Sequence, residues 1–160
     1  MAVKRASGKA TENTVTLFLR KFYGTKVEIQ RLPDKYDTGH YEDARISDHI
    51  VALDSAISTD QGVSGLYFIE SKETNDGNKK SFTISSTFQK GQLQGMRRAR
   101  ALSIPYFVVF QLLKTQEIFL VPSHVILDLM DQDIKSIKVE TIRNYPWTTG
   151  KIYDYYREQP

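Results

Sequence analysis

Apolar residues recur with helical spacing in two stretches of the chain. In the first, residues 10–23, one face would carry Val15, Phe18, Leu19 and Phe22. Thr11 suits the N-cap of this helix, and Gly24 suits the position where it stops. In the second, residues 88–102, one face would carry Phe88, Gln92, Met96 and Ala99. We therefore expect two long helices, the second ended by Pro105.

Strand patterns fill much of the remaining chain. Alternating or unbroken apolar runs predict strands at residues 26–32, 49–53, 66–72, 81–84, 106–112 and 117–121. A polar loop, residues 33–46, follows the first strand, and residues 60–65 suit a hairpin-like return. Residues 75–78 are a strong turn signal, and residues 122–130 suit a short helix. Residues 144–160 show no pattern that assigns them to an element.

This order of elements predicts the fold class. Strands and helices that alternate in this way suit an α/β domain with a mixed central β-sheet flanked by helices. The length of 160 residues suits one hydrophobic core, and neither a repeat nor a linker divides the chain. We expect a single domain over residues 1–160, in which the basic residues 1–9 form a flexible arm.

The amino-acid composition limits where the protein is expected to occur in the cell and which kinds of site it can form. The chain has no cysteine, which excludes disulfides and thiolate metal sites and favours a cytoplasmic location. No apolar run reaches the roughly 18 residues of a membrane span, and the basic start is followed by no apolar segment typical of a secretory signal. We expect no membrane association. A prokaryotic or phage-infected cell fits this compact, cysteine-free chain.

Positive charge is gathered at a few places. The net charge is +3 and the pI is near 9.0. The clusters are Lys4, Arg5 and Lys9, then Lys79 and Lys80, then Arg97, Arg98 and Arg100. This distribution suits a polyanionic partner such as DNA, but scattered solubilising charge gives the same pattern.

Two predicted strands carry acidic residues at positions that could meet. In a strand over residues 66–72, Glu70 and Lys72 share one face, and Asp48 directly precedes the strand at 49–53. If these two strands pair as a hairpin, Asp48 and Glu70 come together at one end of the sheet. Two carboxylates close together can bind Mg²⁺ or Mn²⁺, and Lys72 could orient a water molecule or stabilise negative charge that develops during the reaction. These residues fit the hydrolysis of a phosphodiester.

The spacing makes the pattern more specific than its parts. Glu-x-Lys alone is usually a surface ion pair, and a lone acid such as Asp48 usually starts a strand or a turn. Here an acid precedes one apolar strand, and Glu70 stands near the end of another, 22 residues later (70 − 48). The pair Pro33-Asp34 also offers an acid upstream of Glu70, but a polar loop follows it and not an apolar strand.

The chain resembles a known nuclease family at these positions. Ser47-Asp48 followed by Glu70-Ser71-Lys72 is similar to the PD-(D/E)xK signature of restriction-endonuclease-like nucleases, with serine in place of proline. Within that group it resembles the small Holliday-junction resolvases of the archaeal and RecU types, which include phage-encoded members. Gly91 stands where the RecU type commonly has histidine. The resemblance implies a restriction-endonuclease-like fold.

The resemblance also implies residue roles. Asp48 and Glu70 would be metal ligands with the Ser71 carbonyl as a third, while Lys72 would position the attacking water. Gln92 would contact water or phosphate, and Glu12 would support the metal shell. The candidate phosphate contacts are Arg31, Lys79, Lys80, Arg97, Arg98 and Arg100. From the residues alone, Gln92 could equally be a hydrogen-bonded glutamine at the core edge, and Glu12 a first-turn acid.

The expected function is a homodimeric, Mg²⁺-dependent Holliday-junction resolvase that makes paired symmetric nicks in four-way DNA. One alternative is another endonuclease of this family that cuts duplex or flap DNA. The other is a non-catalytic DNA-binding protein of the same fold. No small-molecule cofactor is expected, since the chain has no Walker-type phosphate loop. The histidines at 40, 49 and 124 are too scattered to predict a zinc site.

Overall fold

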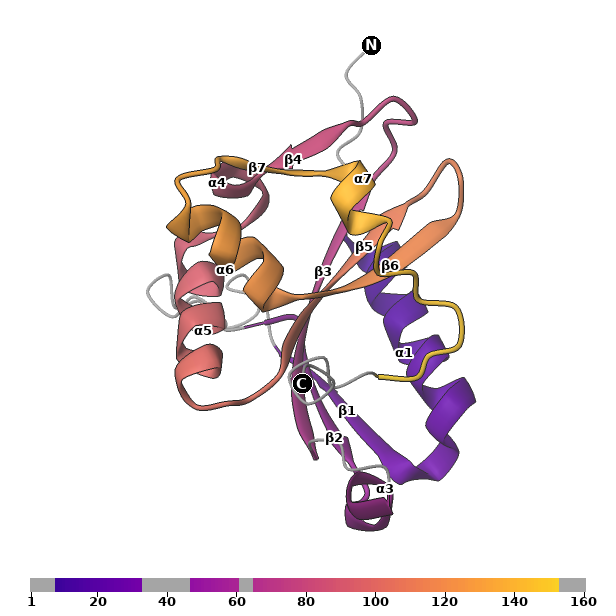
Figure 1. Cartoon of the computed structure of the whole chain (residues 1–160). Coiled ribbons are helices and arrows are strands. Elements are labelled where there is room, and N and C mark those ends of the chain that lie inside the picture. The colour runs from indigo at the N-terminus through magenta and orange to yellow at the C-terminus, as the bar shows by residue number, and fades with distance from the viewer. Residues whose placement is uncertain (1–7, 33–46, 61–64, 153–160) are drawn as a thin grey trace, which may run out of the picture.

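The protein forms a mixed β-sheet with helices on both faces (Figure 1). The computed structural model describes residues 8–32, 47–60 and 65–152. In chain order the elements are α1 (Lys9–Tyr23), η1 (Gly24–Lys26), β1 (Val27–Arg31), β2 (His49–Leu53), α3 (Ser55–Asp60), β3 (Leu66–Thr74), β4 (Ser81–Thr83), α4 (Ile84–Thr87), α5 (Lys90–Ala101), β5 (Tyr106–Leu112), β6 (Glu117–Pro122), α6 (Ser123–Asp131), β7 (Ser136–Lys138) and α7 (Val139–Ile142). None of the helices in these ranges is long and apolar enough to cross a membrane.

The central sheet has five strands in the order β1-β2-β3-β5-β6. Strand β3 pairs antiparallel with β2 and parallel with β5, and β6 returns antiparallel to β5. Helix α5 connects the parallel pair, as such a crossover requires. A separate two-stranded sheet pairs β4 with β7. The mixed sheet flanked by helices confirms the fold class expected from the sequence.

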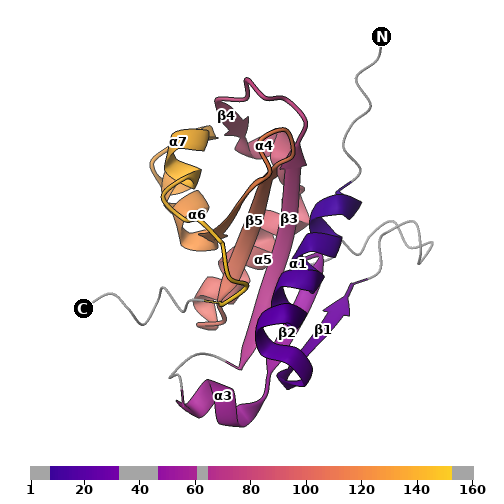
Figure 2. The same ribbon diagram turned by 90° about the vertical axis from the view of Figure 1, so that its right-hand side faces the viewer.

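Two apolar cores lie on opposite faces of the sheet. Side chains alternate along β3, so Tyr67 and Ile69 join the core under α1, whereas Phe68 packs against the core under α5 and α6. Figure 2 shows α1 on one side of the sheet and α5 on the other. The buried strand β5 contributes to both cores, with Phe107 and Phe110 facing opposite ways. Its unbroken apolar sequence reflects this double burial.

Most of the predicted elements are confirmed, with β2 and β5 at the expected bounds. Strands β2 and β3 pair antiparallel, as the expected hairpin-like return requires, but the unexpected helix α3 occupies residues 55–60 of the connection, and residues 61–64 lie outside the described residues. The second long helix begins at Lys90 rather than residue 88, since Phe88 and Gln89 have extended backbones and Gln89 is the N-cap. The helix α4 and the elements β7 and α7 were not expected. The predicted loop at 33–46 lies outside the described residues.

The segment after α7 packs across α1 and the sheet edge. Trp147 is buried, its Nε1–H donates to the Lys151 carbonyl over 3.0 Å, and its ring lies 5.2 Å from that of Phe18. The Ile152 N–H donates to the hydroxyl of Tyr23. Gly150 makes this packing possible, because its φ is +79° and a Cβ there would lie 2.2 Å from the Phe18 carbonyl oxygen.

The carboxylate of Glu73 caps α1 from the neighbouring strand. It accepts hydrogen bonds from the N–H groups of Gly8 and Thr11 and from the Thr11 hydroxyl, at 2.9, 3.0 and 2.6 Å. The expected N-cap, Thr11, is therefore wrong: Gly8 is the N-cap, and Thr11 lies buried inside the first turn. An anion at this end of a helix also interacts favourably with the helix dipole. This contact fixes α1 relative to β3.

We predict that Glu73→Gln lowers the free energy of unfolding by about 1–2 kcal/mol, because a neutral amide bonds these donors less strongly than a carboxylate does. Urea unfolding followed by circular dichroism measures the change. Glu28→Gln on the exposed side of β1 is the matched control and should change stability by less than about 0.5 kcal/mol. Equal stability of the Glu73 variant and the wild type would contradict the cap.

We predict that Gly150→Ala lowers the free energy of unfolding by about 2–4 kcal/mol, through the strained φ and the contact with the Phe18 backbone. The same urea titration measures this loss. Gly77→Ala is the control, because a Cβ there meets only the flexible Lys114 side chain and Gly77 has no positive φ. An equal effect of the two substitutions would contradict this role of Gly150.

Candidate active site

The pairing of β2 with β3 brings the two predicted acids together. The register pairs His49 with Ile69, so Asp48, one residue before β2, lies opposite Glu70. Opposed residues of an antiparallel pair point to the same face, with Cα atoms about 4.5–5.5 Å apart. The Ser71 N–H donates to Asp48 Oδ2 over 2.7 Å, which joins the two segments past the last ladder pair. Asp48 and Glu70 are both buried, at 2% and 1% exposure.

Glu70 is held by a lysine and a glutamine. Its Oε1 lies 2.7 Å from the Nζ of Lys72 and accepts a hydrogen bond from the Nε2 of Gln92 over 2.6 Å. Lys72 in turn donates to the Oε1 of Gln92 over 3.3 Å, which closes a three-membered network. A carboxylate inside a protein keeps its charge only when a cation and hydrogen-bond donors surround it. Lys72 and Gln92 supply these partners to Glu70.

The first turn of α5 fixes the orientation of the Gln92 amide. Gln89 and Gln92 form a capping box, in which the Gln89 N–H donates to Gln92 Oε1 over 2.9 Å. With Oε1 occupied by this donor, the amide nitrogen is directed to Glu70. Gln92 is 2% exposed, so it is a hydrogen-bonded core-edge residue and a member of the site at once. Gln89 was not expected at the site, although its spacing from Gln92 is that of a capping box.

Lys72 stands at the opening of this network. Its side chain is 18% exposed, against 1% for Glu70, so Lys72 is the member of this ion pair that solvent reaches. The Nζ also lies 5.3 Å from the centroid of the Phe88 ring, within the range of a cation–π interaction. Lys72 is therefore placed to meet a charged group that approaches from outside while it remains anchored to Glu70.

Ser47 restrains the backbone just before β2. Its hydroxyl donates to the carbonyl of His49 over 2.9 Å, and its side chain is fully buried. The carbonyl of Asp48 accepts from the Leu32 N–H over 2.8 Å, which ties this turn to the end of β1. These bonds hold Asp48 in place at the position where the similar signature has proline before the acid.

The donor chemistry at this place fits a hard divalent cation. Within a strand, the N–H and C=O of one residue point toward the same neighbouring strand. The Ser71 N–H points to Asp48, so the Ser71 carbonyl lies on the same edge of β3, beyond the paired part of β2. Two carboxylates and a main-chain carbonyl are oxygen ligands of the kind that Mg²⁺ and Mn²⁺ prefer. Asp48, Glu70 and Ser71 would hold such an ion.

No cluster of three or more His, Cys, Asp or Glu side chains suited to a metal occurs within residues 8–32, 47–60 and 65–152. A site built on Asp48 and Glu70 would thus need main-chain and water oxygens to complete its coordination, as Mg²⁺ sites commonly do. Of the three histidines, His40 lies outside the described residues. Burial lowers the pKa of His124 on α6, which makes its neutral form dominant at physiological pH.

The structure groups Glu12 with Arg31 rather than with the network around Glu70. The Arg31 Nε donates to the Glu12 carboxylate over 2.7 Å. Arg31 lies opposite His49 in the sheet, and His49 lies opposite Ile69, which belongs to the core under α1. The side chain of Arg31 is therefore on the α1 face of the sheet. Glu70, Lys72 and Gln92 lie on the α5 face instead. The support of a metal by Glu12 and the phosphate contact of Arg31 stay predictions.

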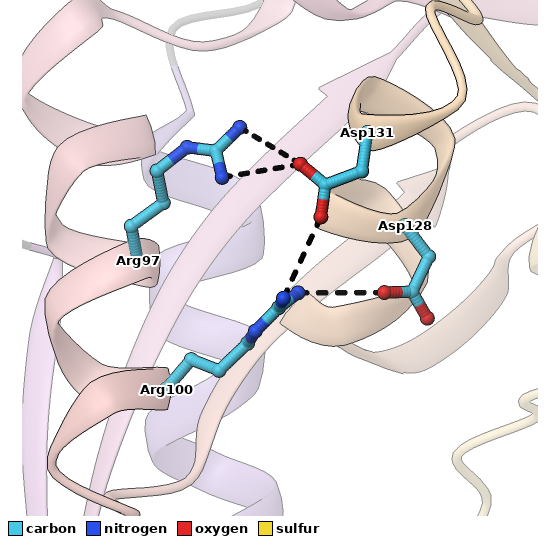
Figure 3. A network of polar contacts seen from close by, with 4 residues as sticks. All are labelled: Arg97, Arg100, Asp128 and Asp131. Atoms are coloured by element: carbon cyan, nitrogen blue, oxygen red, sulfur yellow. Dashed lines mark hydrogen bonds and ion pairs between the residues drawn. The ribbon is translucent and has the colours of Figure 1, made fainter.

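The candidate phosphate contacts on α5 are paired with acids of α6. Figure 3 shows the guanidinium groups of Arg97 and Arg100 directed at Asp131 and Asp128. The distances are 3.2 Å from Arg97 to Asp131, 3.4 Å from Arg100 to Asp128 and 3.5 Å from Arg100 to Asp131. Arg98 lies exposed between them on the helix. Exposed pairs of this kind stabilise little, but they reduce the positive charge that this face presents to DNA.

The solved structure of Hjc, a Holliday junction resolvase from the archaeal hyperthermophile Archaeoglobus fulgidus, is similar to this protein. The two structures align with a TM-score of 0.52 over 86% of this chain and 94% of the Hjc chain, at 10% sequence identity. No protein-family model and no curated protein sequence matches the chain. At the level of the fold, the chain is therefore similar to a resolvase nuclease.

Proposed function

We propose that the protein is a metal-dependent, structure-selective DNA endonuclease of the PD-(D/E)xK type, and specifically a Holliday-junction resolvase. The observation that carries this proposal is the buried network of Glu70, Lys72 and Gln92 beside Asp48. The fold shared with Hjc is a second supporting observation, because it concerns the arrangement of the backbone and not the side chains of the site.

Phosphodiester hydrolysis needs a nucleophilic water, a means to stabilise charge on the phosphate, and an anchored active site. When bound, Mg²⁺ or Mn²⁺ would lower the pKa of the attacking water and polarise the phosphate. Lys72 would orient the water and stabilise the charge that develops on the phosphate oxygens. Gln92 would keep Glu70 and Lys72 in register through its fixed amide. The products are a phosphate monoester and a hydroxyl at the nick.

A homodimer follows from the proposed substrate. A four-way junction has two-fold symmetry, and paired symmetric nicks need two active sites related by the same symmetry. The protein would act in recombination or DNA repair in the cytoplasm of a prokaryote or of a phage-infected cell. Its substrate is recognised by shape and backbone, so no base-specific contact is required.

We predict that wild-type protein with Mg²⁺ makes paired symmetric nicks in a labelled four-way junction and leaves the matched linear duplex intact. Asp48→Asn should lower the cleavage rate at least about 10³-fold, because it removes a charged ligand from the metal site. Denaturing gel electrophoresis measures both rates. Asp133→Asn is the control, because Asp133 is exposed and its positive φ suits asparagine equally well.

The outcomes separate the levels of the proposal. Equal cutting of duplex and junction, abolished by Asp48→Asn, would support the active site and exclude resolvase specificity. Junction binding with no cleavage of any DNA, in Mg²⁺ or Mn²⁺, would replace the nuclease with a DNA-binding protein.

We predict that Gln92→Leu lowers the single-turnover cleavage rate by about 10- to 100-fold while junction affinity stays within about two-fold of the wild type. Leucine fills similar volume but leaves Glu70 without an amide donor and Lys72 without an acceptor. Gln94→Leu is the control, since Gln94 is exposed on the same helix. A normal rate for the Gln92 variant would show that the amide has no part in the chemistry.

A further inference from the structure

The structure divides the candidate DNA-contacting cations into two groups. Arg97 and Arg100 are paired with Asp128 and Asp131 between α5 and α6. Lys79 and Lys80, just before β4, form no ion pair with any residue of the described ranges. A cation without an acidic partner breaks no ion pair when it binds a phosphate, whereas a paired one must first give up its partner. The β4 side is therefore the better surface for a polyanion.

The pairing of β4 with β7 adds a third lysine to the same place. The two-stranded sheet, called the ribbon below, pairs Ser81 with Lys138 and is extended by a hydrogen bond from the Val139 N–H to the Lys80 carbonyl. Lys80 and Lys138 thus lie one residue out of register on adjacent segments, although 58 residues separate them in the chain (138 − 80). Lys138 is exposed and, within the described part of the chain, also has no acidic partner.

The two faces of the ribbon differ in character. Phe82 and Ile137 are paired with each other and buried, at 4% and 0% exposure. Ser81, Thr83, Ser136 and Lys138 alternate with them and form the outer face. Hydroxyl and ammonium groups are common donors to DNA phosphates and sugars. The nearby acid Asp76 is occupied within its own turn, where its carboxylate accepts from the Asn78 N–H.

A row of aromatic rings connects the ribbon to the candidate active site. The Lys79 Nζ lies 5.1 Å from the Phe82 ring, which lies 4.9 Å from the Phe110 ring. Phe110 contacts Phe88 at 6.4 Å, and Phe88 carries the Lys72 ammonium at 5.3 Å. In Figures 1 and 2 the β4–β7 ribbon lies beyond the carboxyl end of β3. Lys72 belongs to the last residues of β3, near that same end. Lys79 and Lys72 thus lie at opposite ends of one packed row of aromatic rings.

We propose that Lys138 on the outer face of the ribbon, together with Lys79 and Lys80 at the entry to β4, binds the sugar–phosphate backbone of the DNA arm next to the cut. This inference rests on the proposed nuclease function and adds to it the surface that holds the substrate. The contact is electrostatic and independent of base sequence, and the packed rings keep its position fixed relative to Lys72. Arg97 and Arg100, which are paired with acids of α6, take no major part in binding.

The test is the salt dependence of junction binding. Anisotropy of a labelled four-way junction in EDTA, between 50 and 300 mM KCl, gives the slope of log K against log salt concentration. Each lost phosphate contact reduces this slope by about 0.9. The triple variant Lys79→Gln/Lys80→Gln/Lys138→Gln should therefore reduce it by about 2–3, with binding roughly 10- to 100-fold weaker at 100 mM KCl. The double variant Lys80→Gln/Lys138→Gln, which leaves Lys79 on Phe82, should reduce it by about 2.

The control is Arg97→Gln/Arg100→Gln/Lys135→Gln. It removes the same formal charge, but each of its cations has an acidic partner. Its slope should fall by less than about 1. Thermal unfolding of each variant confirms that it is folded.

Each result bears on one of the two proposals. Unchanged slopes for the ribbon variants, or equal reductions for ribbon and control, would overturn the ribbon surface while wild-type cleavage of the junction leaves the nuclease standing. Reduced ribbon slopes with a wild type that binds but never cleaves would support the surface and overturn the nuclease. A wild type that does not bind the junction would overturn both.

Discussion

The structure around the candidate site depends on the burial of one carboxylate on the central strand. Glu70 is 1% exposed, and an ionised carboxylate in such a place is unstable unless a cation and hydrogen-bond donors surround it. Lys72 comes from the same strand two residues later, but Gln92 must come from α5. The first turn of α5 is therefore constrained to lie beside Glu70. The contact between Gln92 and Glu70 therefore both positions the crossover helix α5 against β3 and forms part of the candidate site.

The same strand controls the helix on its other face. Glu73 points away from Glu70 and binds the first turn of α1, through the N–H groups of Gly8 and Thr11. One strand thus delivers acids to the N-terminal turns of two helices on opposite faces, and each acid fixes the position of its helix along the strand. In α1 the contact also benefits from the helix dipole. A displacement of β3 would disturb both helices together with the site.

Local pattern was sufficient for six of the seven strands of the described residues, all but β7, and for the central pairing. Asp48 and Glu70 could be brought together from sequence, because a hairpin between neighbouring strands leaves few choices of register. The faces of Glu12 and Arg31 could not, since they follow from the packing of α1 on the sheet. The ends of helices were also hidden: Thr11 looked like a cap, but the actual partner is an acid 62 residues away.

Long-range pairing explains the rest of what the sequence concealed. The α6 partners of the α5 arginines, and the place of Lys138 beside Lys80, depend on contacts between segments distant in the chain. A cluster of like charges in a sequence therefore says little about the charge a surface presents, because folding can neutralise one cluster and enlarge another. Lys79 and Lys80 gain a neighbour of the same sign, and the arginines gain partners of the opposite sign.

The low identity to Hjc shows what the fold requires and what it leaves free. The two chains share a fold at 10% identity, and cores in general tolerate extensive substitution when their volume and apolar patterning are kept. A fold alone does not specify chemistry, because one scaffold can carry different sites. The proposed catalysis therefore depends on local contacts. An apolar residue at position 70 would fill the same space without Lys72 and Gln92, so packing alone does not account for the buried carboxylate of Glu70.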